Sequence, residues 1–104
     1  DIDVDGTSNL DVVDIDGAVN MATTLLVTGV ATLTAKPIAN AGISVKNGST
    51  SAGFVEFFED SDNGTNKVTL IGPASTADVT LTLPNVAGTV ATTDDATALA
   101  IALG

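Results

Sequence analysis

The N-terminal third of the chain contains an internal repeat of 11 residues. Residues 3–13 read DVDGTSNLDVV and residues 14–24 read DIDGAVNMATT. A weaker third copy, LVTGVATL at 26–33, keeps the glycine, and Gly42 marks a fourth, as the spacing drifts from 11 to 12 to 13. A short period with a fixed glycine predicts one strand and one turn per unit, stacked along an axis. Such a unit cannot bury its apolar face alone, so it must stack on copies of itself or on other chains.

The chain has few large side chains with which to build a core. Hydrophobic residues make up 44% of the 104 residues, but fifteen of them are alanines, which bury little area each. The sixteen threonines, twelve valines and ten glycines favour strands and tight turns. A single globule of this size and composition would have a thin core. The composition therefore predicts an all-β chain whose missing burial an oligomer could supply.

The charged and reactive residues exclude several classes of function. The net charge is −10, from 13 acidic residues against three lysines. With no Cys or His, the chain cannot form disulfides, Cys/His zinc sites or Cys- or His-based catalytic sites. Nucleic-acid binding would need a cluster of Lys and Arg that is absent. The longest apolar stretch is far shorter than a membrane span, so we expect no membrane insertion. We also expect neither enzymatic activity nor a cofactor.

The second half of the sequence predicts a compact antiparallel β unit. Its expected strands are 53–59, 67–71, 79–83 and 89–91. The polar stretch 60–66 joins the first two strands, and Pro84 ends the third. The three phenylalanines are expected in the core of this unit, within one chain or shared between chains. Upstream, the dipeptide Asn47-Gly48 favours a type I′ hairpin.

The last residues predict a short helix. Thr93 can serve as the N-cap, and Asp94 and Asp95 place carboxylates in the first turn, where the helix dipole favours them. The residues from Ala96 to Leu103 are strong helix formers. A helix of this length is marginal on its own in water, so its leucines and isoleucine need something to pack against.

The aspartates of the repeat are the only candidate metal ligands, and they are weak candidates. Asp1-x-Asp3-x-Asp5-Gly6 matches the opening of an EF-hand loop, but the twelfth position, which requires glutamate, is Val12. The second copy begins with Val12 where aspartate is required, and it also lacks the glutamate. A solvated acidic strand face closed by a glycine turn is the favoured interpretation. Weak divalent-ion binding between aspartate rows of neighbouring strands remains an alternative. The residues concerned are Asp3, Asp5, Asp14 and Asp16.

Two stretches resemble a known family. The repeat VDGTSNLDVVDIDGAVNMATTL is similar to repeats in tail-fibre and fibre-like structural proteins of marine bacteriophages, including those that infect cyanobacteria and pelagic bacteria. The stretch FVEFFEDSDNGTNKVTLIGPASTADVTLTLPNVAGTV resembles a module of such proteins. The shared features are an acidic strand, Gly64-Thr65-Asn66, then 68–75 with the pattern V-x-L-x-x-P-A-S, then V-T-L-T-L-P at 79–84.

The resemblance implies an elongated homotrimeric β fibre, with three chains intertwined or arranged as a three-sided prism. The division expected is a repetitive shaft segment at 1–46, a β module at 47–92 and a C-terminal helix at 93–104. In such a trimer one apolar face of the third strand could meet its copies around the axis, and the helix could form a three-helix plug. The residues assigned to this oligomer core are Val79, Leu81, Leu83, Phe57, Leu99 and Leu103.

The function that the resemblance implies is that of a host-facing virion fibre, on a tail or a capsid. Its partners would be copies of itself, other virion proteins and a host surface receptor, although no residue can be assigned to receptor binding. The alternative is a subunit of a bacterial surface filament, in which the acidic N-terminal strand inserts into the sheet of the next subunit. The two differ in symmetry, because a trimer closes around an axis whereas strand donation propagates without limit.

Overall fold

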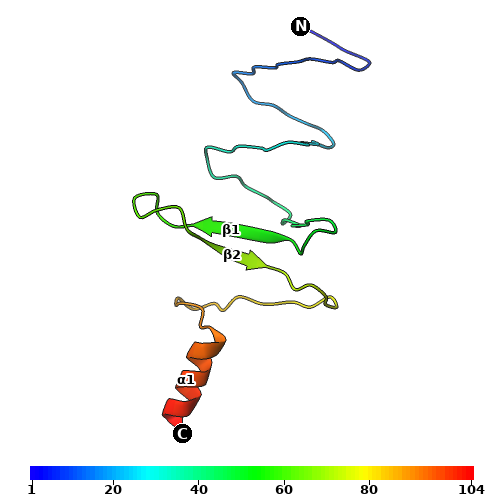
Figure 1. Ribbon diagram of the computed structural model, residues 1–104. Coiled ribbons are helices and arrows are strands. Elements are labelled where there is room, and N and C mark those ends of the chain that lie inside the picture. The colour runs from blue at the N-terminus through cyan, green and yellow to red at the C-terminus, as the bar shows by residue number, and fades with distance from the viewer. The chain divides into compact units, whose positions relative to one another are not determined.

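A computed structural model describes all 104 residues, which divide into two units, Asp1–Ala41 and Gly42–Gly104. The second unit contains all of the regular secondary structure. In chain order this is strand β1 (Phe54–Phe58), strand β2 (Lys67–Ile71) and helix α1 (Thr93–Leu103) (Figure 1). The chain thus has a small antiparallel sheet, with two of the four expected strands, and the expected short C-terminal helix.

The N-terminal unit consists of short segments, called here passes, that are separated by regularly spaced bends. In Figure 1 this stretch, coloured blue to cyan, crosses the view repeatedly and changes direction at each end. No strand is present within 1–41, and no backbone hydrogen bond joins any two of these residues. The bends lie at Asp5-Gly6, Asp11, Asp16-Gly17, Ala22-Thr23, Thr28-Gly29, Thr34-Ala35 and Asn40-Ala41. The expectation of one strand and one turn per 11 residues is wrong for the single chain: each 11-residue copy contains two bends, and its passes have no partner to pair with.

Three of the four glycines that mark the repeat lack the positive φ that glycine allows in a tight turn, whereas the fourth, Gly42, has a φ of 109°. Gly6, Gly17 and Gly29 lie at every second bend, but none has a positive φ. A Cβ atom built on any of the three would have no heavy atom within 4 Å. The intervening bends use Asp, Ala and Thr instead. Nothing within one chain explains why these three positions are glycine.

Strands β1 and β2 form the hairpin that the sequence predicts at 53–59 and 67–71. Their register pairs Phe54 with Ile71 at one end and Phe58 with Lys67 at the other. The loop closes through Glu59, whose backbone N–H donates to the carbonyl of Asn66 at 2.9 Å. The Glu59 carboxylate in turn accepts from the backbone N–H of Asn66 at 3.0 Å. Local hydrogen bonds therefore define this element without help from the rest of the chain.

The type I′ hairpin expected at Asn47-Gly48 does not form. Such a turn needs positive φ at both central residues, and only Gly48 has one, at 60°. The Asn47 side chain instead donates to the hydroxyl of Ser51 at 2.6 Å. The loop brings the Val45 carbonyl against Gly53, where any Cβ atom would clash with it. A wider loop with a glycine contact therefore takes the place of the two-residue turn.

The third and fourth expected strands are also not paired. Residues 79–83 and 89–91 have no strand partner in the chain, and bends interrupt the segment at Asn85-Val86 and Gly88. Pairing through a loop must repay the entropy of ordering both segments, and here no buried surface is available to do so. The sheet of the expected β module is therefore limited to β1 and β2 within one chain.

Helix α1 begins one residue earlier than expected, with Thr92 rather than Thr93 as its N-cap. Thr92 and Asp95 form a capping box. The Asp95 backbone N–H donates to the Thr92 hydroxyl at 3.2 Å, and the Thr92 backbone N–H donates to the Asp95 carboxylate at 3.0 Å. Gly104 ends the helix with a φ of 87°, and its N–H donates to the carbonyl of Ile101.

No side chain in the chain is buried. Every Val, Ile, Leu, Met and Phe is exposed, and even the most covered residues are only half-buried. The chain exposes 10855 Å². A compact folded monomer of this mass would expose roughly 5,400 Å². The single chain therefore leaves uncovered about half of the surface that a folded protein of its size would hide.

Helix α1 should lose stability as the pH falls below the ordinary pKa of an aspartate. The hydrogen bond from the Thr92 backbone N–H, followed by that from the Thr92 side chain, holds the pKa of Asp95 below its usual 3.8. A lowered pKa stabilises the helix fully above pH 3.8, and this contribution is lost as the pH falls through the lowered value. Circular dichroism at 222 nm should show helix loss on acidification. The Asp95→Asn variant should show a smaller loss, and an equal loss would contradict the assignment.

Candidate functional site

The hairpin has one face that is entirely apolar. Because side chains alternate along a strand and directly opposed residues share a face, the register places four apolar residues together. These four, called here the apolar sheet face, are Val55, Phe57, Val68 and Leu70. All four are exposed, with Val68 70% accessible. Exposed apolar area gathered on one sheet face is typical of an interaction surface.

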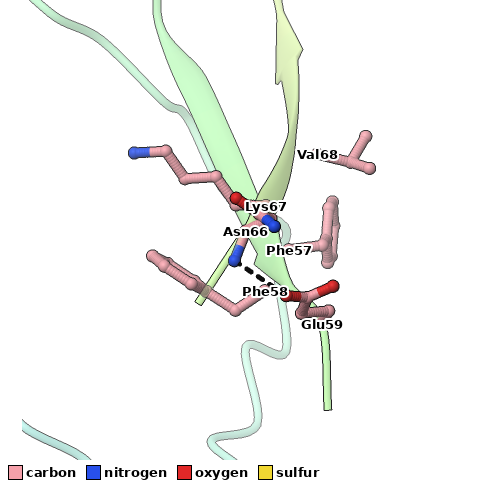
Figure 2. A pocket seen from close by; sticks show the side chains of 6 residues that line it. All are labelled: Phe57, Phe58, Glu59, Asn66, Lys67 and Val68. Atoms are coloured by element: carbon pink, nitrogen blue, oxygen red, sulfur yellow. Dashed lines mark hydrogen bonds between the residues drawn. The ribbon is translucent and has the colours of Figure 1, made fainter. Parts of the chain in front are cut away.

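The opposite face of the hairpin is mixed and partly satisfied within the chain. Lys67 forms an ion pair with Glu56, and its ammonium nitrogen lies 5.6 Å from the centre of the Phe58 ring. Figure 2 shows the loop end of the hairpin, with Phe57 and Val68 on one side of the strands and Phe58 and Lys67 on the other. The charged pair leaves this face suited to solvent, whereas the apolar sheet face has no such compensation.

Helix α1 is apolar on all sides beyond its first turn. Its residues from Ala96 onward are alanine, leucine and isoleucine apart from Thr97. Leu99 and Leu103 are four residues apart and share one face, whereas Ile101 lies on another. All three are at least 60% accessible. A helix that is hydrophobic all round is normally buried, so contacts on more than one side are needed to cover this one.

The segment 79–83 presents Val79, Leu81 and Leu83 without any cover. Leu81 is 91% accessible, among the most exposed leucines of the chain. The six residues assigned to an oligomer core, namely Val79, Leu81, Leu83, Phe57, Leu99 and Leu103, are thus all unpartnered in the single chain. Their role in assembly stays a prediction. Sequence reasoning did not place Val68 and Leu70 beside Phe57, although the strand alternation and the short loop contain that signal.

The candidate metal ligands lie in the N-terminal unit. Asp5 and Asp16 each begin a bend, and Asp3 and Asp14 lie two residues before them. No three acidic side chains of the chain come close enough together to hold a metal ion. A site between rows of neighbouring strands would need other chains, so the weak divalent-ion hypothesis stays a prediction.

The acidic residues at the hairpin loop have partners within the hairpin. Glu56 pairs with Lys67, and Glu59 accepts the Asn66 N–H. The Asp60 carboxylate accepts the backbone N–H of Asp62 at 3.1 Å, which tightens the turn. These contacts account for the carboxylates as turn and strand stabilisers.

Comparison with known protein families, with curated proteins and with solved structures gives no match to this chain. None of its helices has the length and apolar character needed to cross a membrane.

The two neighbouring phenylalanines of β1 offer a matched test of the apolar sheet face. Phe57 and Phe58 are equally accessible, at 59% and 62%, but lie on opposite faces. In an assembly that covers this face, Phe57→Ser should destabilise the protein by about 2 kcal/mol per chain, the value for losing one fully buried phenylalanine. Phe58→Ser should cost clearly less. Urea denaturation of both variants checks this, and equal losses would show that the two faces are covered alike.

Removal of the repeat carboxylates should leave folding intact. Replacing Asp3, Asp5, Asp14 and Asp16 together by Asn removes only solvated charges under the favoured interpretation. The melting temperature at low salt should stay constant or rise, because like charges repel. A large fall in melting temperature, matched by stabilisation of the parent protein on addition of calcium, would instead establish a metal role.

Proposed function

We propose that this chain is a structural subunit of a bacteriophage virion fibre, either a tail fibre or a fibre attached to the capsid. It would be host-facing and non-enzymatic, and it would act as a homotrimer. Its partners would be copies of itself, other virion proteins and a host surface receptor, and its place would be the extracellular particle. The resemblance of the repeat and of the module to such fibre proteins supports this proposal.

The observation that carries the proposal is the complete lack of burial in one chain. Every large apolar residue is exposed, and the accessible surface is about twice that of a compact monomer. An enzyme or a small-molecule binding domain needs a rigid core to position its site. A fibre subunit differs, because its core can be built entirely between chains. The pattern of exposure therefore favours a structural subunit of an assembly over a self-contained binding domain.

A second candidate is a subunit of a bacterial surface filament assembled by strand donation. The observation in its favour is that both outer edges of the β1–β2 sheet are free to accept another strand. Strand donation produces an open-ended polymer, whereas a fibre trimer is closed. Mass in solution therefore separates the two candidates.

The mass of the particle that the protein forms in solution should be three times the chain mass of 10.3 kDa. Sedimentation equilibrium over a range of concentrations would give this value without assuming a shape. An open-ended series of larger species would favour the filament, and a monomer would contradict both candidates.

A charge on the exposed face of 79–83 should abolish the trimer. In Leu81→Asp three carboxylates would meet near one axis, and burying unpaired charges is too costly to sustain assembly. Thr80→Asp is the matched control, because the neighbouring side chain points to the other side of an extended segment. A Leu81→Asp trimer of unchanged stability would remove this segment from the core.

A further inference from the structure

We propose that residues 1–46 are the surface along which copies of this chain assemble, and that the residue just before each bend faces the shared axis. The partner on this surface is a second copy, with its own passes paired to those of the first. The inference rests on the proposed function, in which several copies share one core, and it names the interface that function requires. The pre-bend row is Val4, Leu10, Ile15, Met21, Val27, Leu33 and Ala39.

The first support is the spacing of the row. All seven pre-bend residues are apolar, although each pass also contains polar residues. Successive members are six residues apart, except for a single step of five between Leu10 and Ile15. Val45 continues the six-residue step beyond the last bend. The 11-residue repeat is therefore two passes, of five and six residues, and the spacing of 12 from Gly17 to Gly29 is two passes of six. The last spacing, of 13, arises because Gly42 lies one residue after its bend.

The second support is that exposure follows the same phase. The large pre-bend side chains are between 45% and 66% accessible, even in the single chain. Apolar side chains next to this row in sequence or just after a bend are far more exposed. Leu26 is 89% and Val30 is 91% accessible, whereas Val27 between them is 45% accessible. Val13 and Val19, each two residues before a pre-bend residue, are 58% and 55% accessible and so share the more covered side. The path of the chain thus turns the pre-bend side chains toward one side and the apolar side chains directly beside them in sequence toward the other.

The third support is the unpaired backbone. None of the hydrogen bonds of the chain involves residues 1–46, and the passes do not pair with one another. Backbone groups that share an apolar core must be hydrogen-bonded. A ladder partner must therefore match passes of five and six residues over the whole segment. A second copy of this chain has that spacing because its sequence is identical, whereas an unrelated chain would have to reproduce it.

Charge decides which row the copies share. Apart from Asp1, the N-terminal carboxylates lie at bends or directly before the pre-bend residues, as in Asp3 beside Val4 and Asp14 beside Ile15. Symmetry brings identical rows together, so copies meeting on the polar side would oppose like charges. Copies meeting on the pre-bend row bring uncharged apolar side chains together and leave the carboxylates outside.

The exposed area is large enough for an obligate interface of this kind. The excess over a compact monomer is roughly 5,500 Å², the difference between 10855 Å² and the value expected for its mass. A stable dimer of ordinary size buries roughly 800 Å² per partner. Contacts along the whole segment, together with the hairpin and the helix, are needed to cover such an excess.

Leu26 and Val27 provide the test in the full 104-residue chain. Val27→Lys places a charge in the shared core and should abolish assembly, whereas Leu26→Lys should leave the mass of the parent protein unchanged. Lysine is chosen because the chain carries a net charge of −10, so added repulsion cannot explain a loss of assembly. Val27→Ile is the control that keeps the row apolar and should assemble. Sedimentation equilibrium gives the mass in solution of the parent protein and of the three variants.

Hydrogen exchange of the assembled parent protein gives a second readout. Amides of residues 1–46 should be protected by at least roughly 100-fold over the unfolded chain, because each pass is hydrogen-bonded to another copy. An assembled parent protein with unprotected amides here, or with equal effects of the Leu26 and Val27 substitutions, would overturn the inference while leaving the fibre proposal intact. A monomeric parent protein would overturn the fibre proposal itself.

Discussion

Burial of apolar surface is the main driving force of folding. One copy of this chain buries no apolar side chain, so this driving force is missing from the single chain. All of the large apolar side chains are exposed, so ordering the chain alone costs conformational entropy that no core repays. Every other feature follows from this constraint. The passes of the N-terminal unit lack ladder partners, the segment 79–83 is unpaired, and helix α1 has apolar residues on all sides. Folding and association would then be a single event, with stability that depends on the concentration of chains.

The elements that do form in the single chain are those that local interactions can specify. The β1–β2 hairpin has a short loop closed by Glu59 and Asn66, so the loss of entropy on pairing is small. Helix α1 has a capping box at one end and a glycine cap at the other. Both elements carry apolar surface with no local partner. They therefore provide preformed elements that other chains could cover. In the proposed assembly, the N-terminal segment would depend on other copies for its hydrogen bonds as well.

The difference between local interactions and interactions with distant partners explains what could be predicted from the sequence. Alternation and the polar turn predicted β1 and β2 within one residue, and the Thr-Asp-Asp start predicted α1, because those signals are local. The prediction of a type I′ turn at Asn47-Gly48 was wrong, because the Asn47 side chain binds Ser51 and only Gly48 adopts a positive φ. The strand at 79–83 has the right alternation but no partner in its own chain. The six-residue phase was hidden because the glycines mark only every second bend, so the visible repeat joins two unequal passes.

A regular row has a weakness that the irregular parts of this chain can correct. Copies that meet on a strictly periodic row could slip by one pass and still match apolar residues, as happens when strand register is weakly specified. Two features break that symmetry. The single five-residue step between Leu10 and Ile15 puts any slipped copy out of phase on one side of it. The hairpin and α1 occur once per chain, so they align only when the copies start level. In the proposed assembly, the repeat would supply the length of the interface, and the non-repeating C-terminal unit would set its register.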